Sequence, residues 1–159
     1  LLLTVWRKLP LSGPKLVIIG QRGWQCQAVF DALDNDPQLQ GKVIELSHCD
    51  DGELAGYMQY AQALLFPSFV EGYGMPLIEA LCMGTPVIAS DLPVFHEIAN
   101  DIPDYLNSKD AEAWLELIIA YIQPDSKRRD AQLQRIKGLV APTWPQHFLA
   151  VEALLKKLS

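Results

Sequence analysis

The sequence lacks the features that mark several large classes of protein. Its three cysteines, Cys26, Cys49 and Cys82, have no metal-ligand spacing and form no even set, so we expect a reducing, cytoplasmic environment and no disulfide framework. No apolar run is long enough to span a bilayer, and no signal peptide is visible. Lysine and arginine number 13 against 19 for aspartate and glutamate. The resulting net charge of −6, without a basic stripe, argues against a nucleic-acid partner.

The composition fits one globular domain. The chain has 159 residues, of which 50% are hydrophobic and 20% charged, so it can bury a sizeable core. It begins without a methionine or a helix cap, although Leu2, Val5, Trp6 and Leu9 already have helical spacing. From this we expect that a segment before Leu1 has been removed.

The most informative stretch is ALLFPSFVEGYGMPLIEALCMGTPVIASD, residues 63–91. The apolar run 64–66 predicts a buried strand of a parallel sheet, and the run 87–89 predicts the next one. Between them, Gly72 and Gly74 allow a tight turn that a ligand can approach closely, and Pro76 favours the first turn of a helix. The stretch therefore predicts strand, glycine turn, short helix and strand.

Two glutamates in this stretch, Glu71 before the turn and Glu79 about one turn inside the helix, are candidate ligand-binding residues. A helix that begins at glycines offers unpaired N–H groups and a positive dipole end, which suit a phosphate. An ionised carboxylate accepts hydrogen bonds from both hydroxyls of a cis-diol. One glutamate could hold a ribose and the other a second sugar, on either side of a diphosphate. The alternative is that Glu79 is a solvated helix residue and the glycines form an ordinary loop.

The segment FPSFVEGYGMPLIEALCMGTPVIASD resembles the E-x7-E segment of GT-B-fold retaining glycosyltransferases, the large group 1 family. The resemblance extends from about Leu1 to Phe148. It implies that Glu71 contacts the donor sugar and that Glu79 binds the ribose. It also implies that the amides of the turn, Gly72, Tyr73, Gly74 and Met75, face sugar and diphosphate. The Tyr73 side chain either lines the sugar pocket or packs on the turn.

Two further segments follow predicted strands, at the sheet edge where open α/β sheets bind ligands. In the first, Gly20 and Arg22 are candidate phosphate contacts, although a solvated loop arginine is the favoured interpretation of Arg22. In the second, Ser47 and His48 stand where the family borders the nucleotide base. Asp34-Asn35-Asp36 mimics a metal-binding D-x-D motif, but it lies between a helix and the following strand and is predicted to be a turn.

Several residues are predicted from their pattern to be structural. Met75, Leu77, Ile78, Leu81 and Cys82 are expected in the core, as are Val29, Phe30 and Leu33 of a helix near residues 24–33. Asp50 and Glu53 are expected to form a capping box. The Lys-Arg-Arg run at 127–129 is expected to be a solvated face. Thr143 is expected to cap a last helix that carries Phe148, Val151, Leu155 and Leu158.

The sequence and its resemblance together predict an α/β fold with a doubly wound, Rossmann-like parallel sheet, the C-terminal half of a GT-B fold. Residues 1–159 would form one nucleotide-sugar-binding domain that lacks the family's first strand and its acceptor domain. The expected reaction is metal-independent, retaining glycosyl transfer from a UDP-, GDP- or ADP-sugar, without a cofactor, to a saccharide or lipid-linked acceptor. The fragment alone is expected to be inactive, and any membrane contact would come from absent regions. Two alternatives remain: a non-catalytic nucleotide-sugar-binding module and a GT-B-like sugar-nucleotide epimerase.

Overall fold

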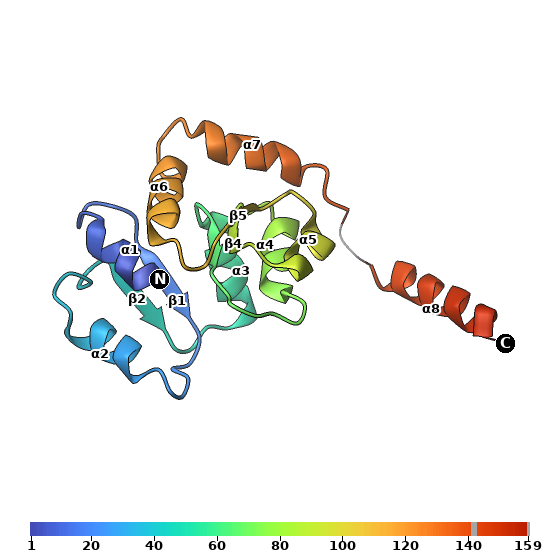
Figure 1. Ribbon diagram of the computed structural model, residues 1–159, viewed down its shortest axis with the longest axis horizontal. Helices are drawn as coiled ribbons and strands as arrows, with labels where there is room; N and C mark the ends of the chain where they lie inside the picture. Colours follow the sequence, from blue (N-terminus) through green and yellow to red (C-terminus); the bar gives the residue numbers. More distant parts are fainter. Residues whose placement is uncertain (141–142, 159) are drawn as a thin grey trace.

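A computed structural model describes residues 1–140 and 143–158 of the chain (Figure 1). The strands are β1 (Leu16–Ile19), β2 (Val43–Leu46), β3 (Leu64–Phe66), β4 (Val87–Ser90) and β5 (Asp104–Leu106). The helices are α1 (Leu2–Lys8), α2 (Gln27–Asn35), α3 (Asp51–Tyr60), α4 (Met75–Cys82), α5 (Pro93–Ala99), α6 (Ala111–Tyr121), α7 (Lys127–Ile136) and α8 (Trp144–Leu158). Helices and strands alternate up to α6, as the α/β prediction requires.

All strand pairs in the described residues are parallel, which confirms the predicted fold class. They form two sheets, β1-β2 and β3-β4-β5, where the sequence led us to expect one. In the first sheet Leu16 pairs with Val43, and in the second Leu64 pairs with Val87. A parallel pair needs a crossover connection, and α2, α4 and α5 supply these connections.

The two sheets share one hydrophobic cluster. Its buried members come from α1, the residue that follows it, β1, the loop before β2, β4 and α6: Val5, Trp6, Leu9, Leu16, Leu39, Ile88, Trp114, Ile118 and Tyr121. A second cluster packs α4 and α5 against β4 through Leu77, Ile78, Ala80, Leu81, Val87, Ala89, Phe95 and Ala99. Leu77, Ile78 and Leu81 are therefore core residues, as predicted.

Burial differs between the central strand and the strands that pair on one side only. All four residues of β4 are buried, because β3 and β5 flank it. In contrast, every residue of β3 is only half-buried, and in β1 Leu16 alone is buried. Within the described residues, each of these two strands has one paired edge and one open edge.

Helix α7 is attached to the second sheet by buried polar contacts. Asp104 of β5, 4% exposed, accepts hydrogen bonds from Arg128 Nε (2.8 Å) and Arg135 Nη2 (2.7 Å). The side chain of Gln132 accepts from the Val87 N–H (2.8 Å) and donates to the Val87 carbonyl (2.7 Å). The basic run is solvated as predicted, since Arg128 keeps 57% of its side chain exposed, but Arg128 also binds Asp104 and Arg129 Nε donates to the Gln62 carbonyl (3.0 Å).

Three predictions of burial are wrong. Met75, the first residue of α4, is 53% exposed, because the packing of this helix begins at Leu77. Cys82 is exposed at the other end of the same helix. Val29 is 43% exposed, and α2 buries none of its residues completely, since it covers only the two-stranded sheet.

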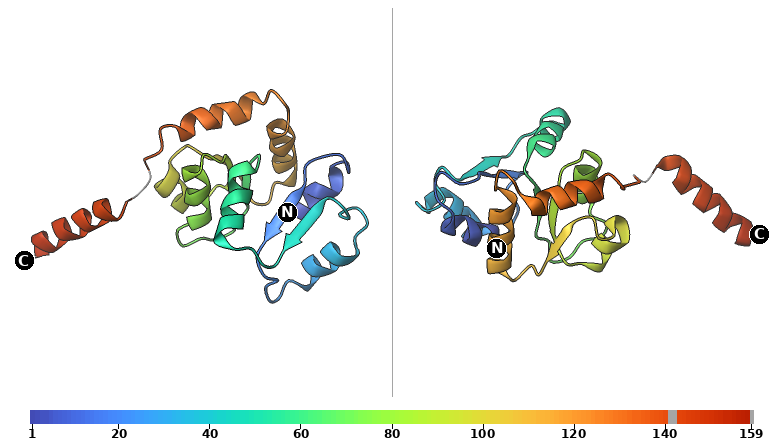
Figure 2. Two further views of the ribbon diagram at one scale, coloured as in Figure 1. Left: turned by 180° about the vertical axis from the view of Figure 1, so that it is seen from behind. Right: turned by 90° about the horizontal axis from the view of Figure 1, so that it is seen from above.

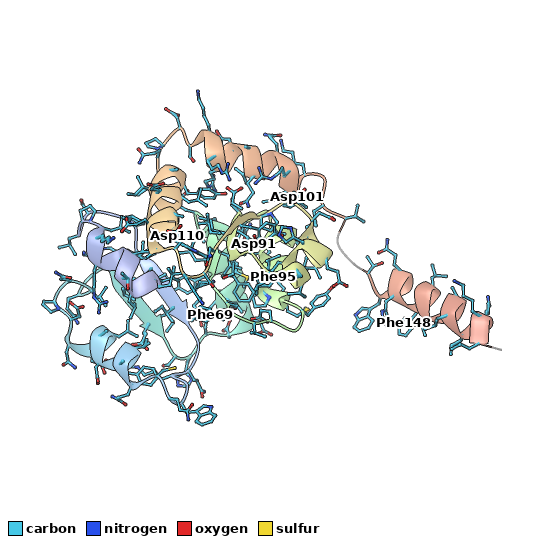
Figure 3. The ribbon with its side chains drawn as sticks, viewed as in Figure 1. Phe69, Asp91, Phe95, Asp101, Asp110 and Phe148 are labelled. Carbon is cyan, nitrogen blue, oxygen red and sulfur yellow. The ribbon has the colours of Figure 1, made fainter. Side chains whose placement is uncertain are left out.

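Helix α8 stands apart from the other elements in all three views (Figures 1 and 2). Gln146 N–H donates to the Thr143 hydroxyl, which confirms the predicted cap. The predicted apolar residues of this helix are exposed, including Phe148 at 57% and Leu158 at 76% (Figure 3). Among the described residues, no helix has the length and apolar character that crossing a membrane requires.

Candidate functional site

The candidate site is built around the turn between β3 and α4. Gly74 is the N-cap of α4 and has a φ of 96°, in the left-handed region that favours glycine. A Cβ at this position would lie 2.7 Å from Cε1 of Phe95, so the turn packs directly on α5. Pro76 occupies the first turn of α4, as predicted, and Gly84 ends the helix with a φ of 80°. The glycines therefore fix where α4 begins and how closely its start packs.

The turn presents unpaired main-chain donors. Within the described residues, the N–H groups of Gly72, Tyr73, Gly74 and Met75 have no hydrogen-bond partner, and the first main-chain bonds of α4 run from Leu77 and Ile78 to the Gly74 carbonyl. Gly72, Tyr73 and Met75 are exposed, whereas Gly74 is buried. Unpaired N–H groups at the positive end of a helix favour an anion such as a phosphate.

Glu71 lies on one side of this turn. Its carboxylate is half-buried and accepts a hydrogen bond from the Ser68 hydroxyl (3.1 Å), which holds it at the end of β3. It lines a hollow of about 320 Å³ whose remaining walls are apolar: Phe69, Val70, Leu92, Pro93 and Val94. Phe69 is 67% exposed at the rim (Figure 3). A single carboxylate in an apolar hollow suits a sugar, which has hydroxyl groups and an apolar C–H face.

Glu79 lies on the other side, one turn inside α4. It lines a second hollow, of about 210 Å³, between α3 and α4, together with Asp51, Leu54, Ala55, Met58 and Met83. The Thr85 hydroxyl donates to the Met58 carbonyl (2.7 Å) and so links α3 to the segment after α4. Glu79 is half-buried, and its carboxylate has no hydrogen-bond or ion-pair partner in the described part of the chain.

The two glutamates thus line separate hollows, with the unpaired N–H groups of the turn on the chain between them. From the sequence we expected Glu71 and Glu79 to lie on either side of a diphosphate. The two separate hollows are compatible with that expectation. A ligand that reached both carboxylates would have to extend from one hollow to the other across the start of α4. A nucleotide-sugar has this shape, because its sugar and its nucleoside are joined by two phosphates.

Arg22, a candidate phosphate contact, is paired with acidic side chains. Its guanidinium donates to both carboxylate oxygens of Asp34 (2.6 and 2.8 Å) and to Glu45 (2.9 Å), and it lies 5.1 Å from the centre of the Phe30 ring. The bonds from Arg22 hold the pKa of the Asp34 carboxyl below its usual value. Two carboxylates therefore compete with any phosphate for this arginine.

The D-x-D motif is paired with arginines. Asp34 binds Arg22, and Asp36 accepts from Arg7 Nε (2.7 Å), whose hydrogen bond lowers the pKa of Asp36. The prediction of a turn was right for Asp36, which caps α2 and accepts from the Gln38 N–H (2.8 Å), but Asp34 and Asn35 still belong to the helix. Among the described residues, no group of three or more acidic, histidine or cysteine side chains could hold a metal ion.

The other candidates lie after β1 and β2. Gly20 has a φ of 136°, and its N–H donates to the Leu46 carbonyl (2.9 Å), so this N–H belongs to the sheet and is not available to a phosphate. Ser47 and His48 are exposed in the loop between β2 and α3, without a hydrogen bond to any described residue. They precede the second hollow along the chain, on the α3 side.

The sequence analysis missed most residues that line the two hollows. Phe69 and Val70 stand beside Glu71 but carry no distinctive pattern. Leu92 and Pro93 follow β4, and their position at the carboxyl end of a parallel strand is the signal that could have identified them. Asp51, the first residue of α3, was not singled out as a site residue. The capping box was confirmed, but it consists of Asp50 and Glu53 alone.

The fold of the chain matches a part of larger solved structures of the GT-B type. It superposes on sucrose-phosphate synthase from Thermosynechococcus elongatus with a TM-score of 0.75 and 22% identity, over 99% of this chain and 41% of that one. It superposes on WaaG, a glycosyltransferase involved in lipopolysaccharide biosynthesis, with a TM-score of 0.67 and 24% identity, over 86% of this chain and 37% of that one. At these identities the likeness shows the fold.

The chain belongs to the Glycosyl transferases group 1 family, whose sequence profile matches residues 1–136. It is 36% identical over 150 residues to the serotype-specific mannosyltransferase WbdA of Escherichia coli. This match covers 90% of this chain and 17% of that protein. It is 42% identical over 83 residues to the O-antigen chain mannosyltransferase RfbU of Salmonella typhimurium, a match that covers 52% of this chain and 24% of that protein. The family predicted from the sequence is therefore confirmed, and the chain spans only a small part of these relatives.

Proposed function

We propose that this chain is the donor-binding half of a retaining, metal-independent glycosyltransferase. In this proposal the nucleoside of a nucleotide-sugar lies against Glu79, the diphosphate lies over the N–H groups of Gly72–Met75, and the transferred sugar lies against Glu71. The acceptor is a saccharide or a lipid-linked saccharide bound by another part of the protein. The relatives WbdA and RfbU are mannosyltransferases, which favours a hexosyl donor.

One observation carries the proposal: two carboxylates in separate hollows flank a row of unpaired main-chain N–H groups. As the sugar–phosphate bond breaks, negative charge grows on the departing diphosphate. Preorganised N–H donors at a helix N-terminus stabilise that charge without a metal ion. Glu71 contacts the sugar in this scheme and is not assigned as a nucleophile.

We further propose that a strand from outside this chain completes the sheet between β1 and β3. Both strands are half-buried and paired on one side only, although residues of both, such as Ile18 and Leu65, pack on the same hydrophobic cluster. A strand at this position would give the spatial order that doubly wound folds use. Hydrogen exchange can test this, since the amides on the open edges should exchange slowly in the protein at its natural length and fast in residues 1–159 alone.

The test of function uses the protein at its natural length, incubated with UDP-, GDP- and ADP-hexoses and a saccharide acceptor. We expect release of free nucleoside diphosphate, a product with the anomeric configuration of the donor by NMR, and unchanged activity in EDTA. Glu71→Gln should lower the rate at least tenfold, whereas Glu116→Gln, at an exposed glutamate of α6 outside both hollows, should not. Inversion at the anomeric carbon, or loss of activity in EDTA, would contradict the proposed mechanism.

The same assay separates the two alternatives. A non-catalytic donor-binding module would bind the nucleotide-sugar but release no nucleotide. An epimerase would convert the sugar, with or without release of the nucleotide, and would need no acceptor. Acceptor-dependent release of the nucleoside diphosphate fits the transferase alone.

A further inference from the structure

We propose that His96 is a positioning residue for the hollow that contains Glu71, and that it acts through a hydrogen bond to Asp91 which protonation of the histidine strengthens. This inference rests on the proposed function, because it takes that hollow as the site of the transferred sugar. It adds a residue outside the E-x7-E segment and a dependence of donor binding on pH.

Helix α5 connects the hollow to the glycine turn. Leu92, its N-cap, and Pro93 and Val94 of its first turn form one wall of the hollow. Phe95, the next residue, is fully buried and fills the space at Gly74, where a Cβ would lie 2.7 Å from Cε1 of its ring. A shift of α5 would therefore move the wall of the hollow and change the packing at the start of α4.

Side-chain hydrogen bonds hold α5 at both ends. At its start, Nε2 of His96 lies 2.7 Å from Oδ1 of Asp91, the residue that follows β4. At its end, the Tyr105 hydroxyl lies within hydrogen-bond distance of the carbonyls of Phe95 (3.0 Å) and Asn100 (2.8 Å). Burial raises the pKa of Tyr105, so this hydroxyl keeps its proton over the pH range in which histidine titrates. Because α5 has only seven residues, too few for a helix that is stable by itself, its position depends on such contacts.

The two ring nitrogens of His96 face different carboxylates. An ionised carboxylate only accepts hydrogen bonds, so Nε2 carries a proton to bind Asp91, and the neutral ring leaves Nδ1 without one. Protonation adds an N–H at Nδ1, which faces Asp101 at 3.8 Å, and turns the bond to Asp91 into an ion pair. Tyr105 is the third titratable group against the imidazole, with 4.0 Å between the ring centroids. Within the described part of the chain, neither aspartate pairs with a lysine or an arginine, so the charged histidine is the cation that they share.

The kinetic test compares wild type with His96→Gln and His96→Ala in the protein at its natural length, between about pH 5.5 and pH 8. Glutamine donates to Asp91 without carrying charge, whereas alanine removes the bond. KM and kcat are measured with UDP-, GDP- and ADP-hexoses. Other titrating groups cancel in the ratio of KM for wild type to KM for His96→Gln.

We expect this ratio to be about 1 at pH 8 and about 0.2–0.5 at pH 5.5, because an ion pair as exposed as that of His96 and Asp91 has a modest effect. His96→Ala should raise KM about threefold or more at both pH values and change kcat by less than about twofold, since it alters binding and not the reaction step. A ratio that does not change with pH would overturn the inference.

Hydrogen exchange provides a second readout that needs no turnover. After correction for the intrinsic pH dependence of exchange, the amides of α5 should be about 2- to 5-fold better protected at pH 5.5 than at pH 8 in wild type, and equally protected at both in His96→Gln. His147→Gln is the matched control, because it removes a histidine of α8, which stands apart from α5 (Figure 1). It should behave like wild type in both assays.

The two assays distinguish the failure of this inference from that of the proposed function. If a nucleotide-sugar is turned over, but neither the KM ratio nor the protection of α5 depends on pH, the role of His96 is refuted and the proposed function stands. If no nucleotide-sugar is turned over, the proposed function fails, and the positioning role falls with it even where exchange shows that His96 holds α5.

Discussion

The assignment of Glu79 to the ribose makes a quantitative prediction. Replacing Glu79 with alanine removes the carboxylate from the hollow between α3 and α4 while leaving a residue with high helix propensity. The carboxylate has no partner among the described residues, so its loss breaks no contact that supports the fold. We expect the midpoint of thermal unfolding to stay within about 2 °C of wild type.

The expected loss of nucleotide affinity follows from the number of bonds and from the exposure of the site. A hydrogen bond to a charged group contributes roughly 1.5–3 kcal/mol when it is shielded from water. The carboxylate of Glu79 is half-buried, so solvent weakens each bond. For two ribose hydroxyls together we expect a loss of about 1–3 kcal/mol, which corresponds to about a 5- to 150-fold increase in Kd.

A double-mutant cycle isolates this interaction. Binding of a nucleoside diphosphate and of its 2′-deoxy analogue is measured by calorimetry for wild type and for Glu79→Ala. In wild type, the missing 2′-hydroxyl should weaken binding by about 0.5–1.5 kcal/mol. In Glu79→Ala the same change should have little effect, because its partner is already absent, and the cycle should show coupling of similar size.

Additivity would refute this reasoning. If the deoxy analogue loses the same affinity in both proteins, Glu79 does not bind the 2′-hydroxyl, whatever the effect of the alanine substitution alone. If Glu79→Ala instead lowers the free energy of unfolding by several kcal/mol, the side chain supports the packing of α4, and the loss of affinity cannot be assigned to the ribose.

Three further predictions concern the fold. Gln132→Leu should lower the free energy of unfolding by about 1–3 kcal/mol in denaturant titrations, because it leaves the buried N–H of Val87 without its acceptor; a loss below about 0.5 kcal/mol would contradict this. Gly74→Ala should cost about 1–3 kcal/mol in the same assay through strain at positive φ and crowding, whereas Gly56→Ala, within α3 and in open space, should not destabilise. Burial raises the pKa of Tyr121, so its phenol ionises more readily in the unfolded chain. Stability should therefore fall as pH rises above about 10, and less steeply in Tyr121→Phe.

Local patterns predicted the elements well, because each depends on residues close in sequence. The runs at 64–66 and 87–89 became β3 and β4, and the glycine turn with Pro76 became the start of α4. The division into two sheets could not be predicted, since it depends on which strands have neighbours in space. The exposure of Val29 has the same cause: an amphipathic pattern shows which face of α2 points inward, but not how much sheet there is to cover.

The arrangement of the candidate site could be predicted only in part, for a similar reason. Glu71, Glu79 and the turn between them belong to one continuous segment, so sequence alone could propose them as candidates. Their separation into two hollows depends on α5 and α3, which come from distant parts of the chain. The pairing of Arg22 with Asp34 and Glu45 depends on a side-chain orientation that no sequence pattern specifies.

The charge of the chain bears on the proposed binding of a diphosphate. A nucleotide-sugar diphosphate is an anion, the chain has a net charge of −6, and neither hollow is lined by lysine or arginine. Arg22, the one basic residue among the predicted phosphate contacts, forms ion pairs with the carboxylates of Asp34 and Glu45. The N–H groups of the turn supply about half of one positive charge. Under the proposed function, we expect the remaining attraction to come from cations that line neither hollow, and a strand added at the open edges of β1 and β3 is one place for them.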